Sequence, residues 1–463
     1  MSAERLVIVG GGMAAVRLCE ELVAGSYDGS VTLLCDEDHP PYNRILLSAV
    51  LEGTQPADAL TLRSEQWFAD RGIDLRLGAR VLEVDRERNE VMLVDGTRLP
   101  YDRLVLATGA IPTLPPIRGL VRLDGSLHPD VHAFRSLADC RRLDVAVKPG
   151  QRAIVVGGGL LGLQVARALS VRGMLTEVVE GADHVLHSQL GEAGGRVLAR
   201  DLRRLGTEVY TGARAVRLRD NVLVLDNGHS LETDLVVLTA GGRPSTALAR
   251  RAGLMVRRGV VVDAHLASVT DDRVHAIGDC AEHRGRTTGF VPPAWEQASV
   301  LARHLCGEDV SYDGSRNVAR LRATGLDVAV LGDPERAVGE IVEMTNPIVG
   351  SHRRLVVQGG RVVAAALVGD LSRVGLVTQL YDRGTVLGVD EPGQLLMPEA
   401  AAAPVTLPDE AEVCACAGVT AGQIRACSSL EACRETTRAT TGCGGCTQAV
   451  CELLGVQPEL ATS

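Results

Sequence analysis

Four cysteines near the end of the chain have the spacing of a metal-binding group. Cys414 and Cys416 form a C-x-C pair, and Cys443 and Cys446 form a C-x-x-C pair farther along. Four thiolates can hold a structural zinc ion or a [2Fe–2S] cluster, and a C-x-x-C pair can also act by thiol–disulfide exchange. Zinc sites usually separate paired cysteines by about two to four residues, so the single-residue spacing of the C-x-C pair favours the cluster.

Short helices are predicted around these cysteines. Thr420 with Gln423, and Ser428 with Glu431, have capping-box spacing, and TQAVCELLG predicts a third helix. Each helix carries one further cysteine three residues from an apolar side chain, which predicts a core position for Cys427, Cys433 and Cys451. The four remaining cysteines would then lie in turns at helix ends, where their sulfurs can converge.

The start of the chain contains a glycine fingerprint. In RLVIVGGGMAAVRLCEEL an apolar run leads into Gly10-x-Gly12-x-x-Ala15 and then a helical pattern. The first glycine permits a tight turn, the second lets a pyrophosphate approach the backbone, and the small third residue lets the helix pack on the strand. Asp36 ends the next predicted strand, where an acid can accept a hydrogen bond from a ribose hydroxyl. A dinucleotide site is predicted.

The same pattern recurs in RAIVVGGGLLGLQVARAL. It places Gly157, Gly159 and Gly162 between a strand and a helix, and Glu180 ends the following strand. An acid at that position repels a 2′-phosphate and accepts from a free ribose diol, so NADH is expected in preference to NADPH. Arg172 lies nearby in sequence and is expected to face solvent.

Two further apolar runs end in small-residue turns suited to backbone approach near a ligand. They are YDRLVLATGAIP, with Ala107, Thr108 and Gly109, and DDRVHAIGDCAEH, with Asp279. The two fingerprints and these two turns, in this order, resemble the pyridine-nucleotide disulfide oxidoreductases over roughly residues 1–310. The resemblance implies FAD on the first fold, with Asp279 at the ribityl chain, and NADH on the second.

The chain lacks the redox-active cysteine pair of the disulfide branch. Its corresponding stretch is PPYNRILLSAVLEG, and Cys35, inside the second predicted strand, is expected to be a buried structural thiol. PYNRILLS is similar to the branch that serves iron–sulfur and rubredoxin-type acceptors, most closely the flavoprotein portion of assimilatory nitrite and nitrate reductases. That resemblance implies that Arg44 and Ser48 lie beside FAD, although Ala49 stands where many relatives have lysine.

Other positions follow the same resemblance. Gln164 replaces a glutamate that relatives often have, and its amide can still bond a nicotinamide carboxamide. PPAWEQA resembles the flavin-edge segment, which implies that Trp295 lies near the isoalloxazine, with plain core packing as the alternative. The cysteine tail is similar to the bacterioferritin-associated ferredoxin domain, which implies that Cys414, Cys416, Cys443 and Cys446 bind a [2Fe–2S] cluster.

The remaining segments carry no predicted chemistry. RRLVVQGGRVVAAALVGD reads as two strands joined by a hairpin at Gly359–Gly360. Residues 397–410, with three prolines and no periodicity, read as a tether. The predicted fold is α/β: two Rossmann-like, glutathione-reductase-like domains, a small α+β domain and a helical tail. The predicted domains are FAD 1–118 and 246–310, NAD 119–245, α+β 311–392, linker 393–409 and [2Fe–2S] 410–463.

Composition limits the possible partners. A net charge of −10 argues against nucleic acid, because binders of its phosphates cluster Lys and Arg. The apolar runs are too short and glycine-rich to cross a bilayer of about 30 Å, and no signal peptide is recognised, so a cytoplasmic protein is expected.

The expected function is electron transfer from NADH through FAD and a [2Fe–2S] cluster to a nitrate or nitrite reductase. No side chain is assigned as a general acid or base, since hydride transfer requires orientation and electrostatics. Because the resembled nitrite reductases continue into a sirohaem domain, nitrogen-oxide chemistry is expected on a separate polypeptide. A reductase that serves a ferredoxin or rubredoxin, for example for an oxygenase, is the alternative, and a docking or iron-sensing tail is a third possibility.

Overall fold

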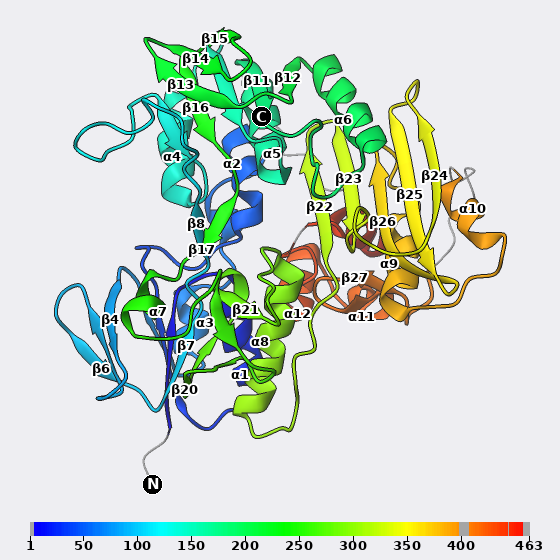
Figure 1. Cartoon of the computed structure of the whole chain (residues 1–463). Coiled ribbons are helices and arrows are strands. Elements are labelled where there is room, and N and C mark those ends of the chain that lie inside the picture. Colours follow the sequence, from blue (N-terminus) through cyan, green and yellow to red (C-terminus); the bar gives the residue numbers. More distant parts are fainter. Residues whose placement is uncertain (1–3, 398–406, 443, 457–463) are drawn as a thin grey trace. The chain divides into compact units, whose positions relative to one another are not determined.

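The computed structural model describes residues 4–397, 407–442 and 444–456. It forms two compact units (Figure 1). The first contains residues 1–44, 58–111 and 242–315, and the second contains residues 45–57, 112–241 and 316–463. Each unit contains a sheet with a run of parallel strands and helices between them, so the predicted α/β class is confirmed. The finer domain boundaries stay predictions.

The first unit is built on a mixed eight-stranded sheet. Its elements are β1 (Arg5–Val9), α1 (Met13–Ala24), β2 (Ser30–Leu34), α3 (Glu65–Ala69), β3 (Ile73–Arg76), β4 (Val81–Asp85), β5 (Glu90–Leu93), β6 (Arg98–Pro100), β7 (Arg103–Leu106), α7 (Ala247–Arg251), β18 (Val260–Val262), β19 (Ala267–Ser268), β20 (Asp271–Ala276), η3 (Gly278–Cys280), β21 (Ala281–His283) and α8 (Val291–Leu305). The strand order is β21-β18-β19-β20-β7-β1-β2-β3, and the run from β20 to β3 is parallel. After its first residue β1 is buried throughout, as expected for a central strand, and α1 packs against α8.

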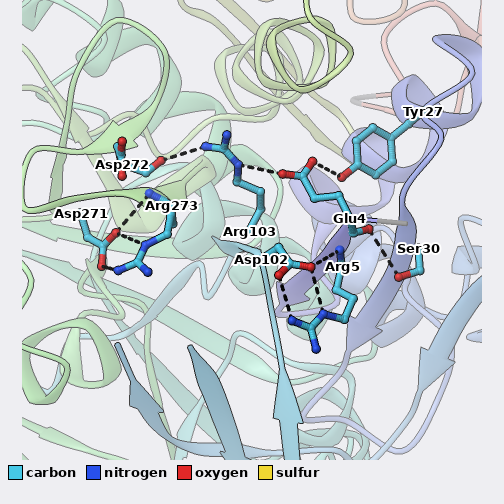
Figure 2. A network of polar contacts seen from close by, with 9 residues as sticks. All are labelled: Glu4, Arg5, Tyr27, Ser30, Asp102, Arg103, Asp271, Asp272 and Arg273. Atoms are coloured by element: carbon cyan, nitrogen blue, oxygen red, sulfur yellow. Dashed lines mark hydrogen bonds and ion pairs between the residues drawn. The ribbon is translucent and has the colours of Figure 1, made fainter. Parts of the chain in front are cut away.

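A polar network joins the starts of the parallel strands in this unit (Figure 2). Arg5, at the start of β1, donates from its backbone and guanidinium to Asp102 at 2.8–2.9 Å. Hydrogen bonds from Arg5 lower the pKa of Asp102 to about 2. Arg103, at the start of β7, donates to Glu4 at 3.1 Å and to the carbonyl of Asp272 at 3.3 Å. These contacts fix the strand register at the edge opposite the glycine fingerprint, which follows the other end of β1.

The second unit begins with a five-stranded sheet that is parallel throughout. Its elements are α2 (Leu47–Glu52), β9 (Val131–Ala133), α4 (Leu137–Ala146), β10 (Arg152–Val156), α5 (Leu160–Val171), β11 (Leu175–Glu180), α6 (Glu192–Arg204), β12 (Thr207–Thr211), β13 (Ala215–Arg219), β14 (Val222–Leu225), β15 (Ser230–Glu232) and β16 (Leu235–Leu238). The order β12-β11-β10-β16-β9 places β10, which precedes the second fingerprint, at the centre. All four residues of β16 are buried beside it.

An antiparallel sheet follows in the same unit. Its elements are β22 (Val318–Ala323), β23 (Leu326–Leu331), β24 (Glu340–Asn346), β25 (Ser351–Gln358), β26 (Arg361–Val368), α9 (Val374–Arg383) and α10 (Glu391–Leu396). The order is β22-β23-β26-β25-β24. Gly359 and Gly360, with φ of 56° and 73°, join β25 to β26, so the predicted hairpin is confirmed. Both residues lie in the left-handed region that glycine tolerates best.

The cysteine module is the last part of the second unit, and we use this name for residues 407–442 and 444–456. Its elements are β27 (Glu412–Cys414), β28 (Val419–Thr420), α11 (Ala421–Arg425), α12 (Leu430–Thr437) and α13 (Thr447–Leu454). Thr420 and Gln423 form the predicted capping box of α11. The prediction for Ser428 was wrong, because Ser429 is the N-cap of α12 and accepts from the backbone of Ala432. Most of the predicted tether lies outside the described residues.

Candidate cofactor sites

The first fingerprint forms the turn between β1 and α1. Gly10 has a φ of +112°, and a Cβ on it would lie 2.4 Å from the carbonyl oxygen of Ala107. Only glycine allows the chain to pass β7 this closely. A Cβ on Gly12 would meet no described atom within 4 Å. Gly10 therefore shapes the turn, whereas Gly12 leaves its backbone open to a ligand.

The start of α1 suits a phosphate group. Gly12 is the N-cap, no described side chain caps the helix there, and its first turn carries no acidic residue. The exposed N–H groups and the positive end of the helix dipole favour an anion at this point. Ala15 is fully buried, as close packing of α1 on the sheet requires. These residues fit the pyrophosphate of a dinucleotide such as FAD.

The segment after β2 positions two acids differently. The side chain of Asp36 is 65% exposed, and one of its carboxylate oxygens lies 3.9 Å from Nε of Arg80. Glu37 accepts a hydrogen bond from the hydroxyl of Tyr42 at 3.1 Å and forms an ion pair with Arg44. The Arg44 guanidinium carbon also lies 4.8 Å from the Tyr42 ring centroid. Arg44 is thus held by an acid that the sequence analysis did not single out.

The small-residue turn after β7 is held by backbone contacts. The backbone N–H of Ala107 donates to Val9 at 2.8 Å, which continues the parallel pairing past the end of β1. The Thr108 hydroxyl donates to the carbonyl of Ser245 at 2.8 Å, and the Ser245 N–H donates to the carbonyl of Gly109 at 2.9 Å. Gly109 has a φ of +65°. The turn therefore lies next to Gly10, as the predicted FAD site requires.

Asp279 lies in η3, directly after β20. The N–H of Gly278 donates to Oε1 of Gln297 at 2.7 Å, and this bond ties η3 to α8. The thiol of Cys280 donates to the carbonyl of Leu106 at 3.2 Å, which ties it to the end of β7. The half-buried Asp279 is therefore fixed from both sides beside the Ala107 turn.

Trp295 is 6% exposed on α8. Its indole Nε1 has no hydrogen-bond partner among the described residues, and a buried donor of this kind normally has one. The guanidinium carbon of Arg17, on α1, lies 5.6 Å from the ring centroid. The orphaned N–H fits a site completed by a bound group, while the Arg17 contact shows that Trp295 also packs between helices.

The second fingerprint repeats the geometry of the first. Gly157 has a φ of +117°, and a Cβ on it would lie 2.7 Å from the carbonyl oxygen of Thr239. A Cβ on Gly162 would lie 1.9 Å from the carbonyl oxygen of Gly157, whereas one on Gly159 would meet no described atom within 4 Å. Gly159 is the N-cap of α5, again without a side-chain cap from the described residues. These residues fit a second dinucleotide phosphate.

Glu180 is held at the end of β11 by backbone donors. Its Oε2 accepts from the N–H of Gly158 at 2.7 Å, and its Oε1 accepts from the N–H of Ala182 at 2.8 Å. The residue is 9% exposed, so its carboxylate is fixed beside the fingerprint. Nδ1 of His187 lies 3.8 Å from Oε1. Each carboxylate oxygen can accept a further bond, as a ribose diol would need.

Three more predicted residues lie in the second unit. Gln164 is buried on α5. Arg172 donates to the carbonyl of Leu51 at 2.8 Å and to Asp144 at 2.7 Å, so its half-buried side chain is occupied by α2 and α4. Ser48 is buried on α2, which contacts α4 and α5. The predicted contact between Ser48 and FAD stays a prediction.

Cys35 has the environment of a structural thiol. It is 3% exposed, and a Cβ on Gly11 would lie 2.4 Å from its sulfur. Burial and the nearby charge of Glu37 raise the pKa of Cys35 to about 12. A thiol in this state is a poor nucleophile at neutral pH, because the thiolate is the reactive form.

The cysteine module gathers three of the four predicted ligands. Cys414 and Cys446 are buried in one apolar cluster, and Cys416 packs against it. The backbone N–H of Thr440 donates to the sulfur of Cys446 at 3.2 Å, the kind of contact that tunes sulfur ligands of iron. Cys443 lies outside the described residues. Within the described ranges no three His, Cys, Asp or Glu side chains form a metal-binding group. Thiolate sulfur is the donor that a [2Fe–2S] cluster requires, and the cluster site itself stays a prediction.

The other module cysteines have packing roles. Cys433 and Cys451 are fully buried, as their helical spacing predicts. Cys427 is half-buried, and its thiol donates to the carbonyl of Gln423 at 3.2 Å.

Several residues that hold these sites could not be recognised from the sequence. Gln297 binds the turn before Asp279, and the Thr239 hydroxyl donates to the carbonyl of Gly157 at 3.1 Å. Thr239 follows the buried strand β16, and this position was the only sequence signal for its role. Contacts of this kind depend on the meeting of distant segments.

Comparison with known proteins identifies the family of this chain. The profile of the pyridine nucleotide-disulphide oxidoreductase family matches residues 4–299. The chain is 34% identical to a nitrite reductase [NAD(P)H] of Bacillus subtilis (strain 168), with 98% of this chain and 58% of that protein covered. It is 31% identical to an assimilatory nitrate reductase electron transfer subunit of the same organism, with 98% and 60% covered. The chain thus spans less than two thirds of these relatives.

The fold is also similar to a solved structure. The covalent putidaredoxin reductase–putidaredoxin complex matches with a TM-score of 0.77 and 27% identity, and 85% of this chain and 96% of that one are covered. The profile match extends over both fingerprints and both small-residue turns described above. The chain therefore belongs to the pyridine nucleotide-disulphide oxidoreductase family.

Proposed function

We propose that this chain transfers electrons from NADH, by way of FAD and a C-terminal [2Fe–2S] cluster, to the catalytic unit of an assimilatory nitrate or nitrite reductase. The observation that carries the proposal is the presence of two dinucleotide cradles and a cysteine module in one chain. The likeness to a nitrite reductase and to a nitrate reductase electron transfer subunit extends over 98% of this chain, and thus into the module.

The residues of each site have distinct tasks in this proposal. Gly12 and the start of α1 bind the FAD pyrophosphate, and Asp279 bonds the ribityl chain. Gly159 and the start of α5 bind the NADH pyrophosphate, and Glu180 accepts from the ribose diol. Bound FAD would supply the conversion of a hydride into single electrons, and a cluster held by the four cysteines would supply a one-electron relay.

The test uses the full chain, produced with sufficient iron. We expect FAD, iron and acid-labile sulfide in the purified protein, and a reduced [2Fe–2S] signal in electron paramagnetic resonance after NADH is added. Cys446→Ser should abolish that signal. Cys427→Ser is the matched control, because this half-buried thiol is not a predicted ligand. Zinc without iron in the wild type, or a cluster that NADH never reduces, would refute the proposal.

A reductase of a small ferredoxin- or rubredoxin-type carrier is the second candidate. It is favoured by the fold similarity to putidaredoxin reductase, which covers 96% of that chain and which was solved joined to its protein partner. The acceptor distinguishes the two functions. Reduction of a ferredoxin without any transfer to a nitrate- or nitrite-reducing unit would favour the carrier reductase.

A further inference from the structure

One arginine of the antiparallel sheet contacts the C-x-x-C loop of the cysteine module. Arg320 lies on β22, opposite Ala329 of β23, and its Nη1 donates to the carbonyl oxygen of Gly445 at 3.3 Å. Gly445 directly precedes Cys446. The side chain is half-buried, so its charge lies at the contact between the two parts rather than fully in solvent.

Arg320 packs closely against Gly445. A Cβ on Gly445 would lie 2.5 Å from Nη1, 3.0 Å from Cδ and 3.1 Å from Cζ of Arg320. Gly444 has a positive φ of 68°, but Gly445 does not belong to the positive-φ glycines. Backbone conformation therefore requires glycine at 444 but not at 445. At Gly445 a Cβ would instead have to displace the guanidinium group of Arg320.

The positive charge of Arg320 has no carboxylate partner in the part of the chain that the structure describes. Among the described residues no carboxylate lies within ion-pair distance of it. By contrast Arg353, on the same sheet, pairs with Asp370, and Arg354 pairs with Glu335. An uncompensated cation at a partly buried position interacts strongly with nearby charge, because the effective dielectric constant there is well below that of water.

We propose that Arg320 is a positioning residue for the C-x-x-C loop, and that its charge raises the midpoint potential of the group that the cysteines hold. This inference rests on the proposed function. Reduction of a [2Fe–2S] cluster adds one negative charge, and cations and hydrogen bonds near the sulfurs favour the reduced state. Arg320 acts through the loop carbonyl and through its charge, and it is not a ligand.

The test is a redox titration of the cluster signal in the full-length protein. We expect Arg320→Gln to reduce the equilibrium constant for cluster reduction about tenfold, which is about 59 mV for one electron. Arg320→Lys keeps the charge and should change it less than threefold. Gly445→Ala should shift the potential in the same direction as Arg320→Gln, because its Cβ displaces the guanidinium group while the charge stays in the protein.

Arg361→Gln is the matched control. It removes the same charge from the same sheet, and Arg361 also donates to a glycine carbonyl, that of Gly384 at 2.7 Å. A midpoint potential of Arg320→Gln equal to that of Arg361→Gln would overturn the inference and leave the proposed function intact. Absence of iron from the wild type would overturn both. If Arg320→Gln does not retain its cluster, an unshifted potential in Gly445→Ala would refute the inference.

Discussion

Two alanine substitutions in the second fingerprint should separate folding from nucleotide binding. A Cβ on Gly162 would lie 1.9 Å from the carbonyl oxygen of Gly157, so the backbone must move by about 1 Å or more. Overpacking a rigid site usually costs about 1–3 kcal/mol, and Gly162→Ala should reach or exceed the upper end of that range. Gly159 has a φ of −78°, which alanine adopts, and its Cβ would meet no described atom within 4 Å. Gly159→Ala should therefore change stability by about 1 kcal/mol or less.

For NADH binding we expect the variant that keeps its stability, Gly159→Ala, to show the direct effect. The methyl group of Gly159→Ala would occupy the space through which a pyrophosphate approaches α5. Loss of one charge-assisted hydrogen bond, at about 1.5–3 kcal/mol, predicts a rise in KM of roughly tenfold to hundredfold. Thermal unfolding and NADH-dependent reduction of ferricyanide measure the two effects. A Gly159→Ala protein with the wild-type KM, or one as unstable as Gly162→Ala, would refute the assignment of this cradle.

Three further predictions test other parts of the sites. Glu180→Gln should raise the ratio of kcat/KM for NADPH to that for NADH by roughly tenfold, because it removes the charge that repels a 2′-phosphate, and steady-state kinetics with both nucleotides measures this ratio. Burial lowers the pKa of His275 to about 4, against about 6.5 in an unfolded chain, so stability should fall by about 3 kcal/mol as the pH drops from 6.5 to 4. Urea unfolding at pH 7.5 and 5 should show a smaller loss of stability in His275→Gln than in the wild type. An equal loss in both proteins would count against this effect of His275. Cys35→Ser should keep NADH-dependent activity within about twofold, since this buried thiol has no redox task, and a large loss would contradict that role.

The glycine fingerprints could be predicted because all their information lies in one short segment. Gly10 and Gly157 each precede a helix that begins three residues later, and both have the positive φ that the motif implies. The hairpin at Gly359 and Gly360 could be predicted for the same reason. Local rules decide local geometry when no competing arrangement has similar energy.

Prediction was weaker where two local choices were equivalent or where distant segments meet. Ser428 and Ser429 can both cap a helix, and the choice of Ser429 still leaves Glu431 in the first turn, where it favours the helix dipole. Gln297 reaches Gly278 only because α8 packs beside η3. The bond from Arg320 to Gly445 joins residues that are 125 positions apart. No pattern along the chain contains such contacts.

The thiols of the dinucleotide folds also bear on where electrons can leave. Cys19, Cys35, Cys140 and Cys280 are all buried, and burial raises the pKa of each thiol. Cys140 and Cys280 also donate to backbone carbonyls, so both are engaged in packing. A redox-active thiol must ionise and reach a substrate, and burial with a raised pKa makes these four thiols poorly suited to both. Sulfur chemistry in this chain is therefore expected in the cysteine module, and the cluster titration of the Arg320 variants measures it there.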